Sequence, residues 1–261
     1  MGLQKDEKLN LLLERLPEGV AAPSSWLADQ GYSRQLVRKY VQGNWLQALG
    51  HGVYARPQGP VTWKGVVLGM QRLAGLPFHV GGVSALNRQG FAHYLPLGGE
   101  NAIHLWGRGK VPAWVRAVSL PESLRFHTAR LFAEDAASVG INAVSSSVRD
   151  WALQVSGPER AILELLSLVD TTDTSFTHAA ELFAGLTSLR PDVINALLGA
   201  CVSIKVKRLF LFLADRHDYP WFSKVTWRKL DLGSGKRAIT KGGVLDKQFM
   251  ITIPESFRGQ S

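Results

Sequence analysis

The pattern of apolar positions predicts three helices and two strands within the first sixty residues. The first helix, over residues 5–16, carries leucines at the i, i+3, i+4 and i+7 positions of an amphipathic stripe. A short second helix follows around Trp26, with Ser24 or Ser25 as its N-cap and Gly31 after its end. The third helix begins after Ser33, its predicted N-cap, and its apolar face consists of Leu36, Val37, Tyr40 and Val41.

Helix, tight glycine turn and helix form the helix-turn-helix pattern of DNA-binding proteins. Two short strands, over 45–49 and 53–55, then flank Gly50-His51-Gly52 and predict a wing. The polar face of the third helix carries no carboxylate, and arginine and glutamine can bond guanine and adenine bidentately. We therefore expect residues 1–58 to be a winged helix-turn-helix domain whose DNA contacts are Arg34, Gln35, Arg38, Lys39 and Gln42, with His51 at the wing tip and Arg56 at its base on backbone phosphates.

A protein-docking role is the alternative for this first domain. Small three-helix units also bind other proteins, and basic helix faces are often only solvated surface. Helix order, turn and wing favour DNA, but the residues alone leave a protein-interaction module open.

Residues 59–92 are predicted to form two connecting helices packed on the winged helix. Helical spacing runs from Trp63 to Ala74 with Thr62 as a candidate cap, and again from Val83 to Gln89. The segment between these helices contains the pair Gly81-Gly82, which permits backbone turns that other residues resist.

Residues 93–261 are expected to form a mixed α/β domain, which makes the whole chain α+β. Short β-rich runs at 91–95, 102–106 and 114–119 suggest an antiparallel sheet. Helices are predicted to start at Pro158 and Pro191, with a short helix near 178–185 and a further one over 206–213. The pattern of the C-terminal part then predicts three strands, at 225–230, 237–240 and 248–253.

Charge supports a polyanionic ligand, because the formal net charge of +9 is unevenly distributed. Residues 30–99 contain seven basic and no acidic side chains, and residues 205–261 contain 12 basic and 5 acidic ones, whereas the segment between them is acidic. A second basic surface is therefore a candidate, made of Lys205, Lys207, Arg208, Lys236, Arg237 and Lys241.

The sequence lacks the complete motifs of the enzyme classes and metal sites that it partly resembles. Gly235-Lys236 lacks the Gly and the Ser/Thr of a phosphate-binding loop, since Leu230 and Arg237 occupy those positions. A nucleotidyltransferase would need a second carboxylate beside Asp246, where Gln248 stands. The seven histidines have no HExxH spacing, and the single Cys201 lies in an apolar helix. We expect no catalytic residue, no metal and no cofactor.

The sequence also points away from membranes. No stretch reaches the roughly 20 apolar residues of a bilayer span, and the first ten residues mix acids and bases unlike a signal peptide. With one cysteine there is no disulfide framework, so we expect a cytoplasmic protein without a membrane partner.

Three motifs together resemble the AbiEi antitoxins of type IV toxin–antitoxin systems, which act in abortive infection. They are Trp45-x-x-x-Leu49-Gly50-x-Gly52-Val53-Tyr54 in the wing, His79-Val80-Gly81-Gly82-x-Ser84-Ala85-Leu86 after it, and a late block from Val206-Lys207-Arg208-Leu209 to Trp221 with Asp231-Leu232-Gly233-Ser234-Gly235-Lys236-Arg237. The likeness spans nearly the whole chain.

The resemblance implies a transcriptional autorepressor whose winged helix binds inverted repeats in double-stranded DNA upstream of its operon, with dimerisation on DNA. It also implies a C-terminal domain needed for antitoxicity. The implied functional partner is a neighbouring nucleotidyltransferase-like toxin, which the antitoxin counters without a stable complex. A stand-alone regulator of the same architecture, without a toxin, remains an alternative.

Overall fold

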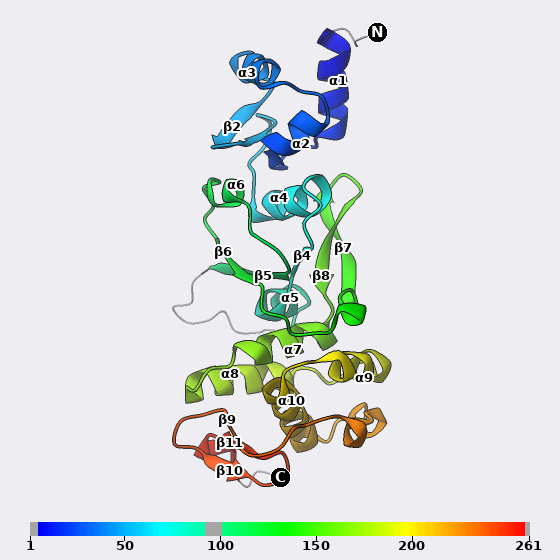
Figure 1. Cartoon of the computed structure of the whole chain (residues 1–261), viewed down its shortest axis with the longest axis vertical. Coiled ribbons are helices and arrows are strands. Elements are labelled where there is room, and N and C mark those ends of the chain that lie inside the picture. The colour runs from blue at the N-terminus through cyan, green and yellow to red at the C-terminus, as the bar shows by residue number, and fades with distance from the viewer. Residues whose placement is uncertain (1–4, 92–100, 259–261) are drawn as a thin grey trace. The chain divides into compact units, whose positions relative to one another are not determined.

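The computed structural model describes residues 5–91 and 101–258 (Figure 1). Helices are combined with three separate sheets, so the predicted α+β class is confirmed. The described residues fall into two compact units. The first is drawn from residues 1–79, 100–128 and 143–154, and the second from residues 80–99, 129–142 and 155–261.

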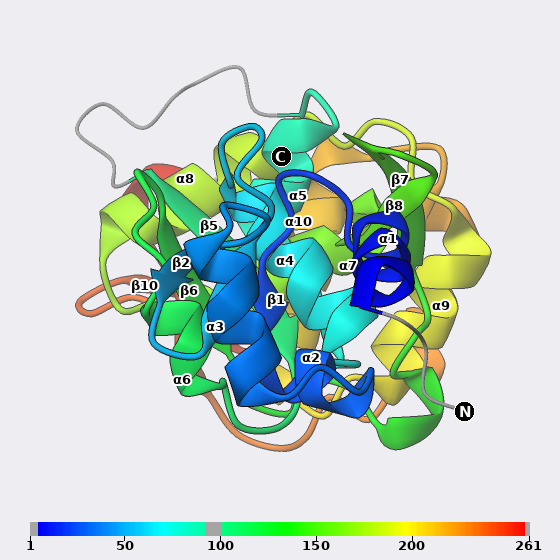
Figure 2. The ribbon, with the colours of Figure 1, turned by 90° about the horizontal axis from the view of Figure 1, so that it is seen from above.

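The N-terminal part of the first unit is a helix-turn-helix with a β-hairpin, as the apolar pattern predicts. Its elements are α1 (Lys5–Arg15), β1 (Ala22–Pro23), α2 (Ser24–Asp29), α3 (Arg34–Gln42), β2 (Gln47–Gly50) and β3 (Val53–Ala55). The short strand β1, which the sequence did not predict, pairs antiparallel with β3 and gives the sheet order β1-β3-β2. Figures 1 and 2 show α3 beside β2, with α1 on the other side of this part.

The connecting helix packs backbone to backbone on the segment that leads into β1. Helix α4 (Trp63–Leu68) continues into a π-helical turn, Gly69–Leu73. A β-carbon at Gly65 would lie 1.7 Å from the carbonyl oxygen of Gly19, and one at Gly69 would lie 2.0 Å from that of Ala21. Only glycine allows this approach at two positions one helical turn apart.

A five-stranded sheet in the order β6-β5-β4-β8-β7 follows. Its strands are β4 (Phe78–Val80), β5 (Ala102–Gly107), β6 (Ser123–His127), β7 (Ile141–Val148) and β8 (Trp151–Ser156), and helix α6 (Ala113–Arg116) lies between β5 and β6 in the chain. Strands β5 and β6 run parallel from the pair Ala102↔Ser123 to the pair Trp106↔His127. The hydrophobic core of the first unit includes Ala21, Val53, Val66, Met70, Phe78 and Val115.

The second unit is mainly helical. Its helices are α5 (Gly82–Arg88), α7 (Pro158–Leu168), α8 (Asp173–Ala184), α9 (Pro191–Ala200) and α10 (Ile204–His217), and a small sheet contains β9 (Arg237–Ala238), β10 (Val244–Asp246) and β11 (Ile251–Ile253). Helix α7 is its centre, because α5, α8, α9 and α10 all pack on it. Proline occupies the first turn of α7 and of α9, as predicted.

A buried carboxylate lies against the first residue of α5. Glu164 on α7 is completely buried and accepts hydrogen bonds from Arg160 Nε at 2.9 Å, Ser156 Oγ at 2.8 Å and the backbone N–H of Gly82 at 3.0 Å. The N–H groups that begin a helix lack intrahelical partners, so Glu164 satisfies one of them and ties α5 to α7.

Several predictions for the later part of the chain are wrong. Residues 114–119 form the end of α6 and a loop, because Pro112 precedes a helical turn there. Residues 225–230 contain a 3₁₀ turn, Trp227–Lys229, in place of a strand. The sheet is not purely antiparallel, since β5–β6 and β4–β8 are parallel. The strand expected at 91–95 lies almost entirely outside the described residues.

Candidate nucleic-acid interface

Helix α3 is positioned by its cap and its apolar face. The side chain of Ser33, the predicted N-cap, accepts a hydrogen bond from the backbone N–H of Leu36 at 3.3 Å. Val37 and Tyr40 are buried beneath the helix. At the C-terminal end, the N–H of Gly43 donates to the carbonyl of Lys39 at 2.9 Å. One face of α3 is therefore fixed on the core, and the other must face solvent.

The solvent face of α3 presents all five polar side chains that the sequence singled out. Each is exposed, and each can donate hydrogen bonds: Arg34, Gln35, Arg38, Lys39 and Gln42. Positions 34, 35, 38 and 42 follow i, i+1, i+4 and i+8 spacing, so three of them lie along one row of the helix. The structure thus brings these side chains together on one side of α3.

The wing is a short antiparallel hairpin whose base is paired at Gln47↔Ala55. Its turn contains Gly52, which has a φ of +72° that favours glycine, and the exposed His51. The carbonyl of Gly52 accepts a hydrogen bond from the backbone N–H of Ser24 at 2.8 Å. This bond fastens the wing turn to the start of α2, so the tip is not a free loop.

An open groove of about 640 Å³ lies between α3 and the wing. Arg34, Gln35 and Arg38 line it from the helix, and His51 lines it from the wing. None of the nine described residues that line it is acidic; the others are Ser24, Val41, Ala48, Gly52 and Tyr54. Donors from two elements therefore converge on one concave surface.

Ser24 and Tyr54 were not among the predicted site residues. Strand alternation was the available signal for Tyr54, because it lies between the buried Val53 and Ala55 and must point to the other face of the hairpin. Ser24 was considered only as a helix cap. Its exposure beside the wing follows from the bond between Ser24 and Gly52, which no local pattern reveals.

Arg56 has a different role from the predicted phosphate contact. Its Nη2 lies 3.0 Å from Glu18 Oε1, and its Nη1 donates to the carbonyl of Leu13 at 3.4 Å. The side chain is only 16% exposed. Arg56 therefore links the wing base to α1 and to the loop after it, and does not line the groove.

The candidate second basic surface is only partly a surface. Lys207 and Arg208 are buried, so their inclusion in it is wrong. Lys205 is half-buried, and its Nζ donates to the carbonyls of Ser167 at 3.1 Å and Val169 at 2.7 Å. Burial lowers the pKa of this amine, and the negative charge of Asp170 opposes that change. Three members are exposed near the C-terminal sheet: Lys236, Arg237 and Lys241.

Chemistry of other kinds has little support in the described part of the chain. No group of three or more His, Cys, Asp or Glu side chains within residues 5–91 and 101–258 is placed to hold a metal ion. Cys201 is buried, and burial raises the pKa of its thiol, which disfavours the reactive thiolate. None of the described helices has both the length and the apolar character to span a bilayer.

Family models account for nearly the whole sequence. Residues 5–97 match the AbiEi antitoxin N-terminal domain of transcriptional regulators, and residues 100–254 match the transcriptional regulator described as AbiEi antitoxin of type IV toxin–antitoxin systems. The chain belongs to the AbiEi antitoxin family. The resemblance drawn from the wing and the two later motifs is therefore confirmed.

One solved structure shares the fold of this chain. The chain is similar to the RV2827C protein from Mycobacterium tuberculosis, with a TM-score of 0.54 and 15% sequence identity over 97% of this chain and 92% of that one. At this identity the likeness concerns the fold alone. No curated protein matches the sequence.

Proposed function

We propose that this AbiEi-family protein is an autorepressor and antitoxin that binds inverted repeats upstream of its own operon through the groove between α3 and the wing. Helix α3 lies in the major groove, where Arg38 and Gln35 face base edges, and His51 lies on the backbone. Residues 1–58 carry the DNA contacts. The functional partner is a nucleotidyltransferase-like toxin encoded beside it.

One observation carries this proposal: α3 presents five exposed donors, and three of them line an open groove beside the wing that no described carboxylate lines. DNA phosphates and base acceptors are anionic or electron-rich, so a surface without carboxylates avoids repulsion along the whole contact. A solvated surface with no ligand would tolerate acids among those positions. The wing adds support because it gives the helix a second, fixed contact point.

The proposal also includes a second basic surface, formed by exposed cations near the C-terminus. Lys236, Arg237 and Lys241 are the members of the second basic set that stay accessible. We assign to them the second basic surface, and to the part of the chain after residue 92 the antitoxin role. Two copies of the chain occupy the two halves of an inverted repeat.

The test is a titration of the upstream DNA region at several salt concentrations, followed by fluorescence anisotropy. The logarithm of the binding constant should fall with the logarithm of salt concentration by about 0.9 per phosphate contacted. Arg38→Ala should weaken binding by about 1–3 kcal/mol if Arg38 contacts a base. Arg72→Ala removes another exposed arginine, which does not line the groove, and should change binding little.

Two results would count against DNA binding by this groove. One is the absence of binding to the upstream region, or binding that does not respond to salt. The other is equal loss of affinity in Arg38→Ala and Arg72→Ala, which would indicate diffuse attraction in place of a docked α3. Either outcome would favour the protein-interaction module.

A further inference from the structure

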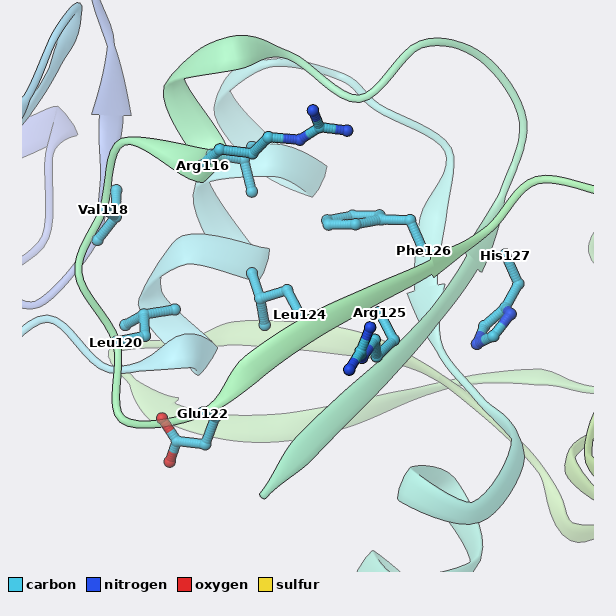
Figure 3. A pocket seen from close by; sticks show the side chains of 9 residues that line it. Arg116, Val118, Leu120, Glu122, Leu124, Arg125, Phe126 and His127 are labelled. Carbon is cyan, nitrogen blue, oxygen red and sulfur yellow. The ribbon is translucent and has the colours of Figure 1, made fainter. Parts of the chain in front are cut away.

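A second groove in the first unit, separate from the proposed DNA site, follows strand β6. It has a volume of about 470 Å³. One wall is β6 itself, and the other is formed by the end of α6 and the loop after it (Figure 3). Residues 124–127 of β6 all contribute to its lining, so the groove has the length of an extended segment of several residues.

Strand β6 is the edge of the five-stranded sheet, and its neighbour there is β5. The parallel pairing with β5 uses the backbone groups on one side of β6. Alternate N–H and C=O groups on the other side of β6 point away from β5. Such an edge is a template onto which another extended chain can add as a strand.

The apolar lining of this groove is firmly held. Leu124 and Phe126 are half-buried and pack on the core, where Phe126 meets Phe78 edge to face with ring centroids 5.3 Å apart. Val118 and Leu120 are half-buried on the opposite wall. Figure 3 shows Leu124 and Phe126 directed into the space that this loop encloses. These side chains offer pockets for apolar groups at alternate positions of an added strand.

The charge around the groove is positive. Residues 101–130 contain five basic side chains and one acidic one, Glu122. Arg116 and Arg125 line the groove and are exposed. Carboxylates beside the apolar positions of a bound segment would therefore be attracted, and lysines or arginines would be repelled.

We propose that the groove along β6 binds an extended segment of a partner protein, in which apolar side chains alternate with carboxylates, as an added sixth strand. Backbone pairing with β6 supplies affinity, and Leu124, Phe126 and Arg116 supply selectivity. A peptide suits this groove better than DNA does, because apolar side chains lie between its charged ones and one carboxylate, Glu122, also lines it, whereas DNA contacts need a surface of exposed polar donors.

The test uses ¹⁵N–¹H spectra of the full chain, titrated with acetylated, amidated heptapeptides. The acidic probe alternates valine and glutamate, and a matched basic probe alternates valine and lysine. We expect the acidic probe to shift the amide signals of residues 115–127 and to bind about tenfold more tightly than the basic probe, since two charge contacts of up to about 1 kcal/mol each separate them. Equal affinities, or no shifts in residues 115–127, would overturn the proposal.

Two further comparisons separate strand addition from charge attraction. Of two acidic probes N-methylated at odd or at even positions, one should bind and the other should not, because alternate N–H groups of a strand face opposite sides. Arg116→Glu should weaken the acidic probe several-fold, about 1 kcal/mol, whereas Lys110→Glu changes an exposed cation that does not line the groove and should leave affinity almost unchanged.

Specific outcomes contradict the proposal. They are equal binding of the two N-methylated probes, equal effects of Arg116→Glu and Lys110→Glu, and displacement of the acidic probe from residues 115–127 by a DNA duplex of unrelated sequence. The last result would assign the groove to nucleic acid. Because no residue of α3 is involved, these outcomes are independent of the salt titration that tests the proposed DNA site.

Discussion

Gly50 at the end of β2 lies directly against the carbonyl group of Ala117, which follows α6. A β-carbon at position 50 would be 2.3 Å from the Ala117 oxygen and 2.8 Å from the Ala117 β-carbon. Both distances are far below van der Waals contact, so only glycine allows the wing to approach this backbone. The end of β2 next to the wing turn is therefore braced by Ala117, which lies 67 residues later in the chain.

We expect Gly50→Ala to lower the free energy of unfolding by about 1–3 kcal/mol, because overpacking forces either the wing or the α6 loop to move. Urea denaturation followed by tryptophan fluorescence measures the change. Gly199→Ala is the control, since nothing lies within 4 Å of a β-carbon placed at position 199 in α9. Alanine there should be neutral or slightly stabilising. If the two variants had the same stability, the contact between the wing and Ala117 would be absent in solution.

The sequence predicted the N-terminal part well because its signals are local. The Ser33 cap, the glycine turns and the amphipathic spacing of α3 all lie within a few residues of the structure they produce. The buried state of Arg208, the pairing of Arg56 with Glu18 and the brace at Gly50 depend on residues far away in sequence. No local pattern distinguishes these side chains from exposed ones.

The central sheet was harder to predict for two physical reasons. Short apolar runs such as residues 114–119 fit a strand or a helical turn equally well. The run forms helix α6, which is part of the crossover connection that the parallel strands β5 and β6 require. Strand β7 was missed because its sequence, INAVSSSV, has little of the alternation that marks a half-buried strand. Its hairpin with β8 depends on the rest of the sheet.

Arg208 holds the loop that carries Gly233-Ser234-Gly235. Its guanidinium donates to four backbone carbonyls: Leu232 at 2.7 Å, Gly235 at 2.7 Å, Gly233 at 2.9 Å and Met250 at 3.1 Å. Arg208→Lys keeps the positive charge, but one ammonium group lacks the fork of donors that reaches all four oxygens. We expect a loss of about 1–3 kcal/mol in unfolding free energy.

Limited trypsin digestion provides a local readout of the same change. Lys236 and Arg237 are exposed in this loop, and cleavage after them should accelerate in Arg208→Lys when the carbonyls lose their donors. Arg228→Lys alters an exposed arginine and serves as the control. Unchanged stability together with unchanged cleavage would mean that the guanidinium does not hold the loop.

The ion pair between Glu159 and Arg190 makes the stability of the second unit depend on pH. Burial by itself raises the pKa of this carboxyl, but hydrogen bonds from Arg190, at 3.0 Å to Oε1 and 2.9 Å to Oε2, outweigh burial and lower the pKa below its ordinary value of 4.5. A lowered pKa in the folded state contributes stability that is complete above pH 4.5 and is lost as the pH falls below it.

Glu159→Gln should therefore be less stable than the natural protein at pH 7, by about 1–2 kcal/mol, since the half-exposed Arg190 is screened by solvent. The difference in urea midpoint should shrink when both proteins are compared again at a pH that is far enough below 4.5 to protonate this carboxyl in the folded state. Glu181→Gln, at an exposed position of α8, should show no such trend. A difference that stays constant between the two pH values would remove the ion pair as its cause.

The proposed docking of α3 in the major groove predicts the spacing of the two operator half-sites. If two copies occupy an inverted repeat, the centres of the half-sites should lie about 34 Å apart, or a multiple of it, on one face of the DNA. Inserting about five base pairs between them places the second copy on the opposite face and should abolish cooperative binding, whereas about ten base pairs restore the same face. Gel-shift titrations of the three DNAs with the full chain measure this. Binding that is the same on all three DNAs would contradict this arrangement of two copies on one face.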